Sequence, residues 1–150
     1  MTEHHYHTQL DWQGNTGNGY REYSRTHRVV ASGTTLDLSA DPAFRGDGQL
    51  PNPEQLLLAA ASSCQLLSFL ALAALEHVEA LEYRDDASAS MRDVDGVTRI
   101  DTIDLRMSIT VRGRDKAVTL RLLEKAHEQC YIANSLSAQV TLHPAVTVIA

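Results

Sequence analysis

Two cysteines are the residues of this 150-residue chain whose type and setting favour chemistry. Cys64 lies in a long stretch without formal charge, beside Ser62, Ser63 and Gln65, and Cys130 lies near the end of a second apolar periodic segment. Free cysteine is among the most buried residue types, so two arbitrary cysteines more often fill core volume. The small polar residues around Cys64 are not expected of pure packing, and they narrow the odds between a packing role and a redox pair of the two cysteines.

A reactive Cys64 needs a nearby cation, because a thiol in an apolar setting has a raised pKa and is inert. Arg45 is the first candidate, since it lies in a glycine-flanked loop just before the segment that carries Cys64. An arginine stays charged, lowers a thiol pKa and can hydrogen-bond a peroxide oxygen. Glu54 could hold that guanidinium through two parallel hydrogen bonds.

The spacing of Glu54 and Cys64 predicts a dimeric site. They are ten positions apart on one predicted helix, which is roughly 15 Å along the axis. One arginine of the same chain would struggle to reach both. A two-fold dimer with antiparallel long helices would bring Glu54 of one chain near Cys64 of the other.

Cys130 ends a predicted helix, where the helix dipole does not favour a thiolate. That setting suits a resolving thiol, which attacks after the first cysteine has become a sulfenic acid. His127 lies one turn earlier and could take a proton, although a partly exposed helix histidine is the more common reading. Strand alternation separates His4 from His5 and His7, and the cysteines lack CxxC spacing, so we predict no metal site.

The elements that must position these residues follow from hydrophobic periodicity. Asn52 is a good N-cap and Pro53 suits the first helical position, so a long apolar helix is expected from there to about His77. Alternation over 81–92 and 102–112 predicts a long antiparallel hairpin. The remaining expected elements are strands over 4–12, 22–31, 36–38 and 140–148, and a helix over 116–129.

These elements predict a single α+β domain over residues 1–150, with antiparallel strands curled around the long central helix. The net charge of −6 and the lack of a basic patch argue against a nucleic-acid partner. The polar N-terminus is unlike a secretory signal, which predicts a cytoplasmic protein. Residues 55–75 carry no formal charge and match a membrane span in length, but their polar residues favour a buried core helix and no membrane partner.

Two segments resemble the signatures of the OsmC/Ohr family, the osmotically inducible protein C and organic hydroperoxide resistance proteins. The first is Asn-Pro-Glu-Gln-Leu-Leu at 52–57, followed by Ala-Ala-Ala-Ser-Ser-Cys at 59–64. The second is Ala-His-Glu-Gln-Cys-Tyr-Ile-Ala-Asn-Ser-Leu at 126–136. Order and spacing agree over nearly the whole chain, and the segment 39–47 looks like a less-characterised OsmC-like branch. Tyr131 and Gln65 depart from what many members carry after each cysteine.

The resemblance implies an intertwined homodimer with two interface sites that reduce organic hydroperoxides. Cys64 matches the peroxidatic cysteine, Cys130 the resolving cysteine and Glu54 the family glutamate. Arg45 matches the arginine of the OsmC branch. In the Ohr branch that arginine lies further toward the N-terminus, which leaves three alternatives here: Arg21, Arg25 and Arg28.

The reaction that the resemblance implies needs no bound cofactor. A small dithiol, of the lipoyl type, would reduce the Cys64–Cys130 disulfide by thiol exchange, and no glycine-rich phosphate motif is present. Three other functions are compatible with the sequence. They are a redox sensor without turnover, a binding module for a small hydrophobic ligand, and a hydrolase that uses Cys64 and His127.

Overall fold

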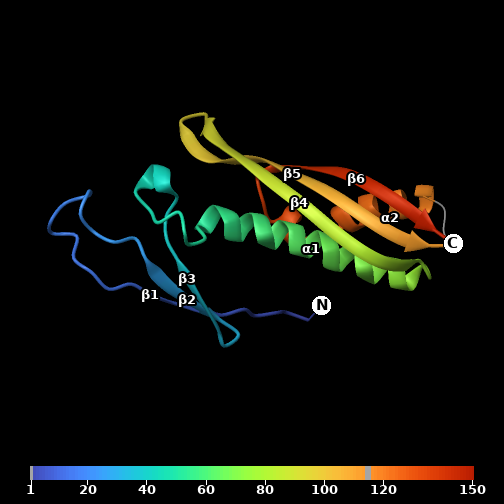
Figure 1. Ribbon diagram of the computed structural model, residues 1–150, viewed down its shortest axis with the longest axis horizontal. Coiled ribbons are helices and arrows are strands. Elements are labelled where there is room, and N and C mark those ends of the chain that lie inside the picture. The colour runs from blue at the N-terminus through green and yellow to red at the C-terminus, as the bar shows by residue number, and fades with distance from the viewer. Residues whose placement is uncertain (1, 114–115) are drawn as a thin grey trace. The chain divides into compact units, whose positions relative to one another are not determined.

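The computed structural model describes residues 2–113 and 116–150, and it divides into two compact units, Met1–Leu56 and Leu57–Ala150 (Figure 1). Each unit has its own three-stranded sheet. The long helix begins at the end of the first unit and continues through the second. This mixture of two sheets and a long helix confirms the predicted α+β class. One domain over 1–150 stays a prediction.

The N-terminal unit contains an antiparallel sheet of three short strands. They are β1 (Thr8–Asp11), β2 (His27–Ala31) and β3 (Thr34–Leu38), in that order across the sheet. Ser32 and Gly33 both have positive φ angles, 49° and 77°, as a two-residue hairpin turn requires. The first two strands are shorter than predicted. The residues between them form turns that carry aromatic side chains instead.

Hydrogen bonds of Ser39 close the loop between β3 and the long helix. The Ser39 N–H donates to the Pro51 carbonyl at 3.0 Å, and the Ser39 hydroxyl accepts from the Asp47 N–H at 2.9 Å. Within the loop lies the 3₁₀ helix η1 (Pro42–Phe44). A Cβ at Gly46 would lie 1.6 Å from the Ala40 carbonyl oxygen, so the loop closes only with glycine there.

Helix α1 (Pro53–Leu75) begins where the sequence predicts. The Asn52 side chain accepts from the Gln55 N–H at 2.9 Å, and the Gln55 side chain accepts from the Asn52 N–H at 3.1 Å. This reciprocal pair is a capping box that satisfies two otherwise unpaired donors. The helix ends two residues before the predicted end, since His77 has a left-handed φ of 56°.

The C-terminal unit has a sheet in the order β4-β5-β6, with α1 running along it (Figure 1). β4 (Glu79–Val94) and β5 (Val97–Arg112) form the predicted antiparallel hairpin. β6 (Gln139–Ile149) instead pairs parallel with β5. The chain returns from β5 to β6 through helices α2 (Lys116–Glu128) and α3 (Tyr131–Asn134), and such a crossover permits parallel pairing.

One apolar core joins the sheet to both longer helices. The predicted inner face of β5 is buried throughout, and it clusters with buried residues of α1 and α2. On β4, register shifts beside Leu81 and Met91 leave both side chains exposed, although alternation predicts them inside. The buried members of β5 are Ile103, Leu105, Met107, Ile109 and Val111.

Helix α1 is only partly covered within the chain. It is the one helix in the described ranges that is long and apolar enough to cross a bilayer by length and composition. Phe69 and Leu72 are buried in the core, whereas Leu67 is 63% exposed and Leu70 is 40% exposed. The exposed leucines form an apolar face of α1 that no other part of the described chain covers fully.

Candidate active site

Cys64 lies mid-way along α1, and its sulfur receives several hydrogen bonds from a segment distant in sequence. Burial by itself would raise the pKa of the Cys64 thiol. The backbone N–H groups of Ile132 and Tyr131, the Cys130 thiol and the Ser68 hydroxyl donate to the sulfur, and together they hold the pKa below its ordinary value. Cys64 is therefore the cysteine that ionises first.

Cys130 lies outside α2, in a different setting from the predicted one. α2 ends at Glu128, and Cys130 is the extended N-cap residue of α3, where its sulfur accepts from the Ala133 N–H at 3.5 Å. Burial, followed by the hydrogen bond and the charge of Cys64, raises the pKa of the Cys130 thiol, although the Ala133 amide opposes this shift. The prediction that Cys130 ends α2 is wrong, because the chain leaves the helix at Gln129 and turns.

The short helix α3 is the element that sequence reasoning missed. Its first amides, those of Tyr131 and Ile132, point at the Cys64 sulfur and stabilise its negative charge as a nearby cation would. Asn134 and Ser135 end this turn and are typical of helix ends and turns, which is the signal that the sequence offered. The Tyr131 N–H is one of these donors. A proline at this position would remove it, because proline has no backbone N–H.

Gln65, the residue that follows Cys64 on α1, is fully buried. Its side-chain amide nitrogen donates to the Leu123 carbonyl oxygen at 3.1 Å. This hydrogen bond links α1 to α2 one residue after Cys64. Gln65 therefore acts as a structural link between the two helices.

A polar cluster lies on the inner face of β4, against the part of α1 that carries Cys64. The Ser62 hydroxyl donates to the Asp85 carboxylate, whose other oxygen is buried. Two residues earlier on the same strand, the Tyr83 ring contacts Phe69 with centroids 5.8 Å apart. Asp85 was not predicted as a site residue. The signal for it was an acidic residue at an inward position between Tyr83 and Ala87.

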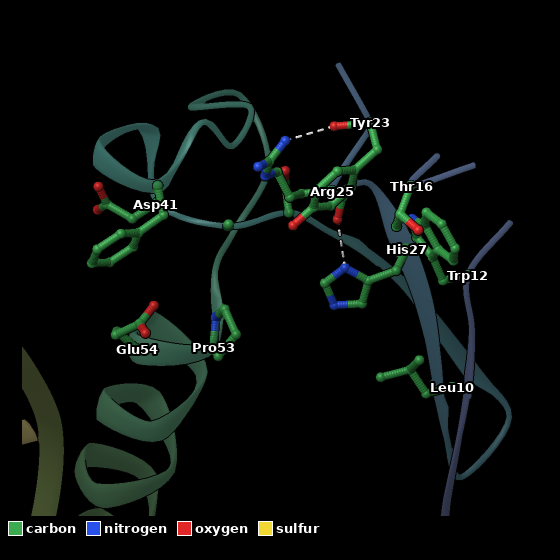
Figure 2. A pocket seen from close by; sticks show the side chains of 12 residues that line it. Leu10, Trp12, Thr16, Tyr23, Arg25, His27, Asp41, Pro53 and Glu54 are labelled. Atoms are coloured by element: carbon green, nitrogen blue, oxygen red, sulfur yellow. Dashed lines mark hydrogen bonds between the residues drawn. The ribbon is translucent and has the colours of Figure 1, made fainter. Parts of the chain in front are cut away.

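The N-terminal unit holds a separate cavity of about 470 Å³, lined mainly by apolar and aromatic side chains (Figure 2). Arg25 and Glu54 both line it, and among the residues that the structure describes no other arginine does. The remaining lining residues are Leu10, Trp12, Thr16, Tyr23, His27, Ser39, Ala40, Asp41, Phe44 and Pro53. The cavity thus combines an apolar wall with the Arg25 guanidinium and two carboxylates, those of Asp41 and Glu54.

Arg25 is fixed in this cavity by contacts with two tyrosines. Its guanidinium donates to the Tyr23 carbonyl at 2.7 Å and to the Tyr20 carbonyl at 2.6 Å. The guanidinium carbon also lies 3.8 Å from the centroid of the Tyr23 ring and 4.7 Å from that of the Tyr20 ring. These contacts hold the positive charge in place, and no carboxylate in the described part of the chain forms an ion pair with Arg25.

The other candidate arginines lie outside this lining. Arg45 is exposed and has a left-handed φ of 65° at the end of η1. Arg28 pairs with Asp37 across β2 and β3 at 2.8 Å, and Arg21 is exposed. The structure therefore brings Cys64 together with Cys130 in one unit, and Glu54 together with Arg25 in the other.

Two further expectations from the sequence concern a role for His127 and the prediction of no metal site. The Nδ1 atom of His127 is buried and has no hydrogen-bond partner within residues 2–113 and 116–150. In the same ranges, no group of three histidine, cysteine or acidic residues is placed to hold a metal ion.

The two thiols are hydrogen-bonded to each other, and their pKa values are shifted in opposite directions. The protein is therefore of the class that carries a paired-cysteine site on an α+β fold. The chain belongs to the OsmC-like protein family, whose profile matches residues 46–144. The organic hydroperoxide resistance protein of Xanthomonas axonopodis pv. citri is 32% identical over 120 residues, which cover 77% of this chain and 82% of the relative. The uncharacterized protein YmaD of Bacillus subtilis is 22% identical over 146 residues, covering 95% of this chain and 93% of YmaD.

Solved structures support the same fold. An OsmC-like protein of unknown function from Vibrio cholerae superposes with a TM-score of 0.82 at 26% identity, covering 99% of this chain and all of that one. An organic hydroperoxide resistance protein OsmC from Legionella pneumophila has a TM-score of 0.70 at 22% identity and covers 97% of this chain and all of that one. The fold and the family thus agree with the resemblance that the two cysteine segments carry.

Proposed function

We propose that this protein is a thiol peroxidase that reduces organic hydroperoxides through a Cys64–Cys130 disulfide cycle. The observation that carries the proposal is the hydrogen bond between the two cysteine side chains, with the Cys64 pKa lowered and the Cys130 pKa raised. A nucleophile and a resolving thiol need this order of ionisation. The hydroperoxide resistance protein of Xanthomonas supports the same substrate class.

The proposed cycle has three balanced steps. The Cys64 thiolate attacks the terminal peroxide oxygen, the O–O bond breaks, and a proton joins the leaving oxygen to give an alcohol and a Cys64 sulfenic acid. The Cys130 sulfur attacks that sulfenic acid, the S–S bond forms, and water leaves. A dithiol, which we propose is of the lipoyl type, then returns two electrons and two protons through a mixed disulfide.

We propose the Arg25 and Glu54 cavity as the place where the hydroperoxide binds. Its apolar wall suits an organic substituent, and a guanidinium can hydrogen-bond the peroxide oxygens. Glu54 and Cys64 are separated by roughly 15 Å along α1. An antiparallel homodimer would place the cavity of one chain at the cysteine pair of its partner. The exposed leucines of α1, Leu67 and Leu70, support such a contact.

The test is hydroperoxide consumption by the purified protein with dihydrolipoamide as reductant. We expect Cys64→Ser to abolish turnover. Cys130→Ser should consume one equivalent of cumene hydroperoxide and then stop, because the sulfenic acid forms but is not resolved. A Cys64→Ser variant that consumes cumene hydroperoxide at the parent rate would contradict the proposal.

The aromatic-lined cavity also favours a second candidate, a binding module for a small hydrophobic ligand. In that case both cysteine-to-serine variants would keep the parent affinity for the ligand, and peroxide consumption would be absent. A redox sensor would form the disulfide once without turnover.

Both cysteines are free thiols, which suits a reducing compartment, so we propose the cytoplasm as the location.

A further inference from the structure

We propose that His27 accepts a hydrogen bond from the terminal O–H of the bound hydroperoxide, an inference that rests on the proposed peroxidase function. His27 is the first residue of β2 and lines the cavity of the N-terminal unit. Its ring points away from β2 into that cavity (Figure 2). An imidazole can act through either ring nitrogen, so its tautomer decides what it offers to a ligand.

One hydrogen bond fixes the tautomer of His27. The Nδ1 atom of its ring lies 2.7 Å from the carbonyl oxygen of Arg25. A carbonyl oxygen only accepts hydrogen bonds, so Nδ1 carries the proton and donates it. In the neutral ring Nε2 then has a free lone pair, and no group within residues 2–113 and 116–150 donates to it. His27 therefore offers the cavity a hydrogen-bond acceptor.

Arg25 offers the complementary group in the same cavity. Its guanidinium has donors only and is held by the carbonyl oxygens of Tyr23 and Tyr20, while its own carbonyl holds the ring of His27. One wall thus carries both a donor and an acceptor. A hydroperoxide matches this pair, because its terminal oxygen carries an O–H and its inner oxygen has only lone pairs.

The two carboxylates of the cavity are less suited to accept from this O–H. The Asp41 carboxylate caps η1 and accepts from the Ala43 N–H at 2.7 Å. Glu54 lies in the first turn of α1, where the amides at the helix start favour its negative charge. A carboxylate beside the terminal oxygen would also repel the approaching thiolate, whereas a neutral imidazole would not.

The proposed hydrogen bond agrees with the balance of the first chemical step. The Cys64 thiolate attacks the terminal oxygen, the S–O bond forms and the O–O bond breaks. The terminal O–H stays intact and becomes the O–H of the sulfenic acid, while a proton from water completes the alcohol at the other oxygen. His27 moves no proton, so it binds the ground state and the transition state alike. Losing such a contact raises KM and leaves kcat unchanged.

The experiment uses two amide variants that each keep the function of one ring nitrogen. His27→Asn keeps a donor for the Arg25 carbonyl but has no group at the position of Nε2. His27→Gln is longer and presents an amide oxygen, an acceptor, near the position of Nε2. His4→Asn is the matched control, because His4 is exposed and does not line the cavity.

Ligand binding is followed through the fluorescence of Trp12, the one tryptophan of the chain, which lines the cavity. The probes are cumyl alcohol, which carries an O–H, and its methyl ether, which does not. The titrations are run at about pH 8, where an imidazole is neutral. We expect the parent protein to bind the alcohol about 3- to 10-fold more tightly than the ether, as for one net hydrogen bond.

The variants should separate the acceptor from the rest of the ring. His27→Asn should lose the preference for the alcohol, and its KM for cumene hydroperoxide should rise by about the same factor at constant kcat. His27→Gln and His4→Asn should both keep the preference. Turnover is measured with dihydrolipoamide as reductant.

The inference and the proposed function fail in different ways. A preference for the alcohol that persists in His27→Asn overturns the role of His27, and so does its absence in the parent protein. A loss in His27→Gln as large as in His27→Asn also overturns it, because the ring would then act through packing. If the parent shows the preference but consumes no peroxide, the peroxidase function fails while the acceptor at His27 stands.

Discussion

The side chains of Cys64 and Cys130 are hydrogen-bonded to each other, and this contact moves their two thiol pKa values in opposite directions. The thiol that donates keeps its proton, and the sulfur that accepts loses its own more easily. The amides at the start of α3 strengthen the difference, because those of Tyr131 and Ile132 point at Cys64. The two thiols therefore already differ in acidity in the resting protein.

The first prediction concerns the pH dependence of Cys64 alkylation. The lowered pKa should place its midpoint below that of an ordinary cysteine. Cys130→Ala removes one donor to the Cys64 sulfur, so the midpoint should move to higher pH. Cys130→Ser keeps a donor and should shift it less. Iodoacetamide rates followed by peptide mass spectrometry measure this, and identical midpoints in the parent and Cys130→Ala would contradict it.

The second prediction separates the candidate arginines. Arg25→Lys keeps the charge but loses the planar fork that contacts both tyrosines, and kcat/KM for cumene hydroperoxide should fall roughly 10- to 100-fold. Arg84→Lys is the control, because Arg84 is exposed and pairs with Glu82 on β4. If Arg45 is the active-site arginine, Arg45→Lys will show the larger loss and Arg25→Lys the smaller one.

The third prediction tests the dimer. Leu67→Glu puts a charge on the exposed apolar face of α1 and should convert a dimer to a monomer in sedimentation velocity. Peroxide turnover should fall as well, because a monomer loses the proposed contact between Glu54 of one chain and Cys64 of the other. Leu81→Glu is the matched control on β4, where Leu81 is 44% exposed. A Leu67→Glu monomer with full activity would rule out a site shared between chains.

The fourth prediction concerns the loop before α1. Gly46→Ala forces a Cβ into the Ala40 carbonyl and should lower the free energy of unfolding by ~1–3 kcal/mol. Gly48→Ala is the control, since its Cβ would meet only the Pro42 ring, at 3.2 Å. Urea denaturation measures both. Equal midpoints for the two variants would show that the loop rearranges freely.

Much of the fold could be predicted because local patterns decide it. The N-cap Asn52 and the following Pro53 mark the start of α1, and alternation along β5 marks its buried face. The parallel pairing of β6 was not predicted, since the direction of a returning strand depends on how the crossover packs. The exposure of Leu81 and Met91 was missed because the register shifts on β4 depend on pairing with β5.

The sequence by itself determined that Cys64 lies in a long apolar helix and that both cysteines belong to an OsmC-like chain, but it misplaced Cys130 at the end of the second helix. Only the tertiary structure decided what surrounds the sulfurs. Two of the donors at Cys64 are backbone amides of α3. Any residue except proline supplies an amide, so the role of these two positions leaves little trace in residue type. Likewise, Arg25 rather than Arg45 shares a cavity with Glu54 because the turns after β1 fold Tyr20 and Tyr23 around its guanidinium.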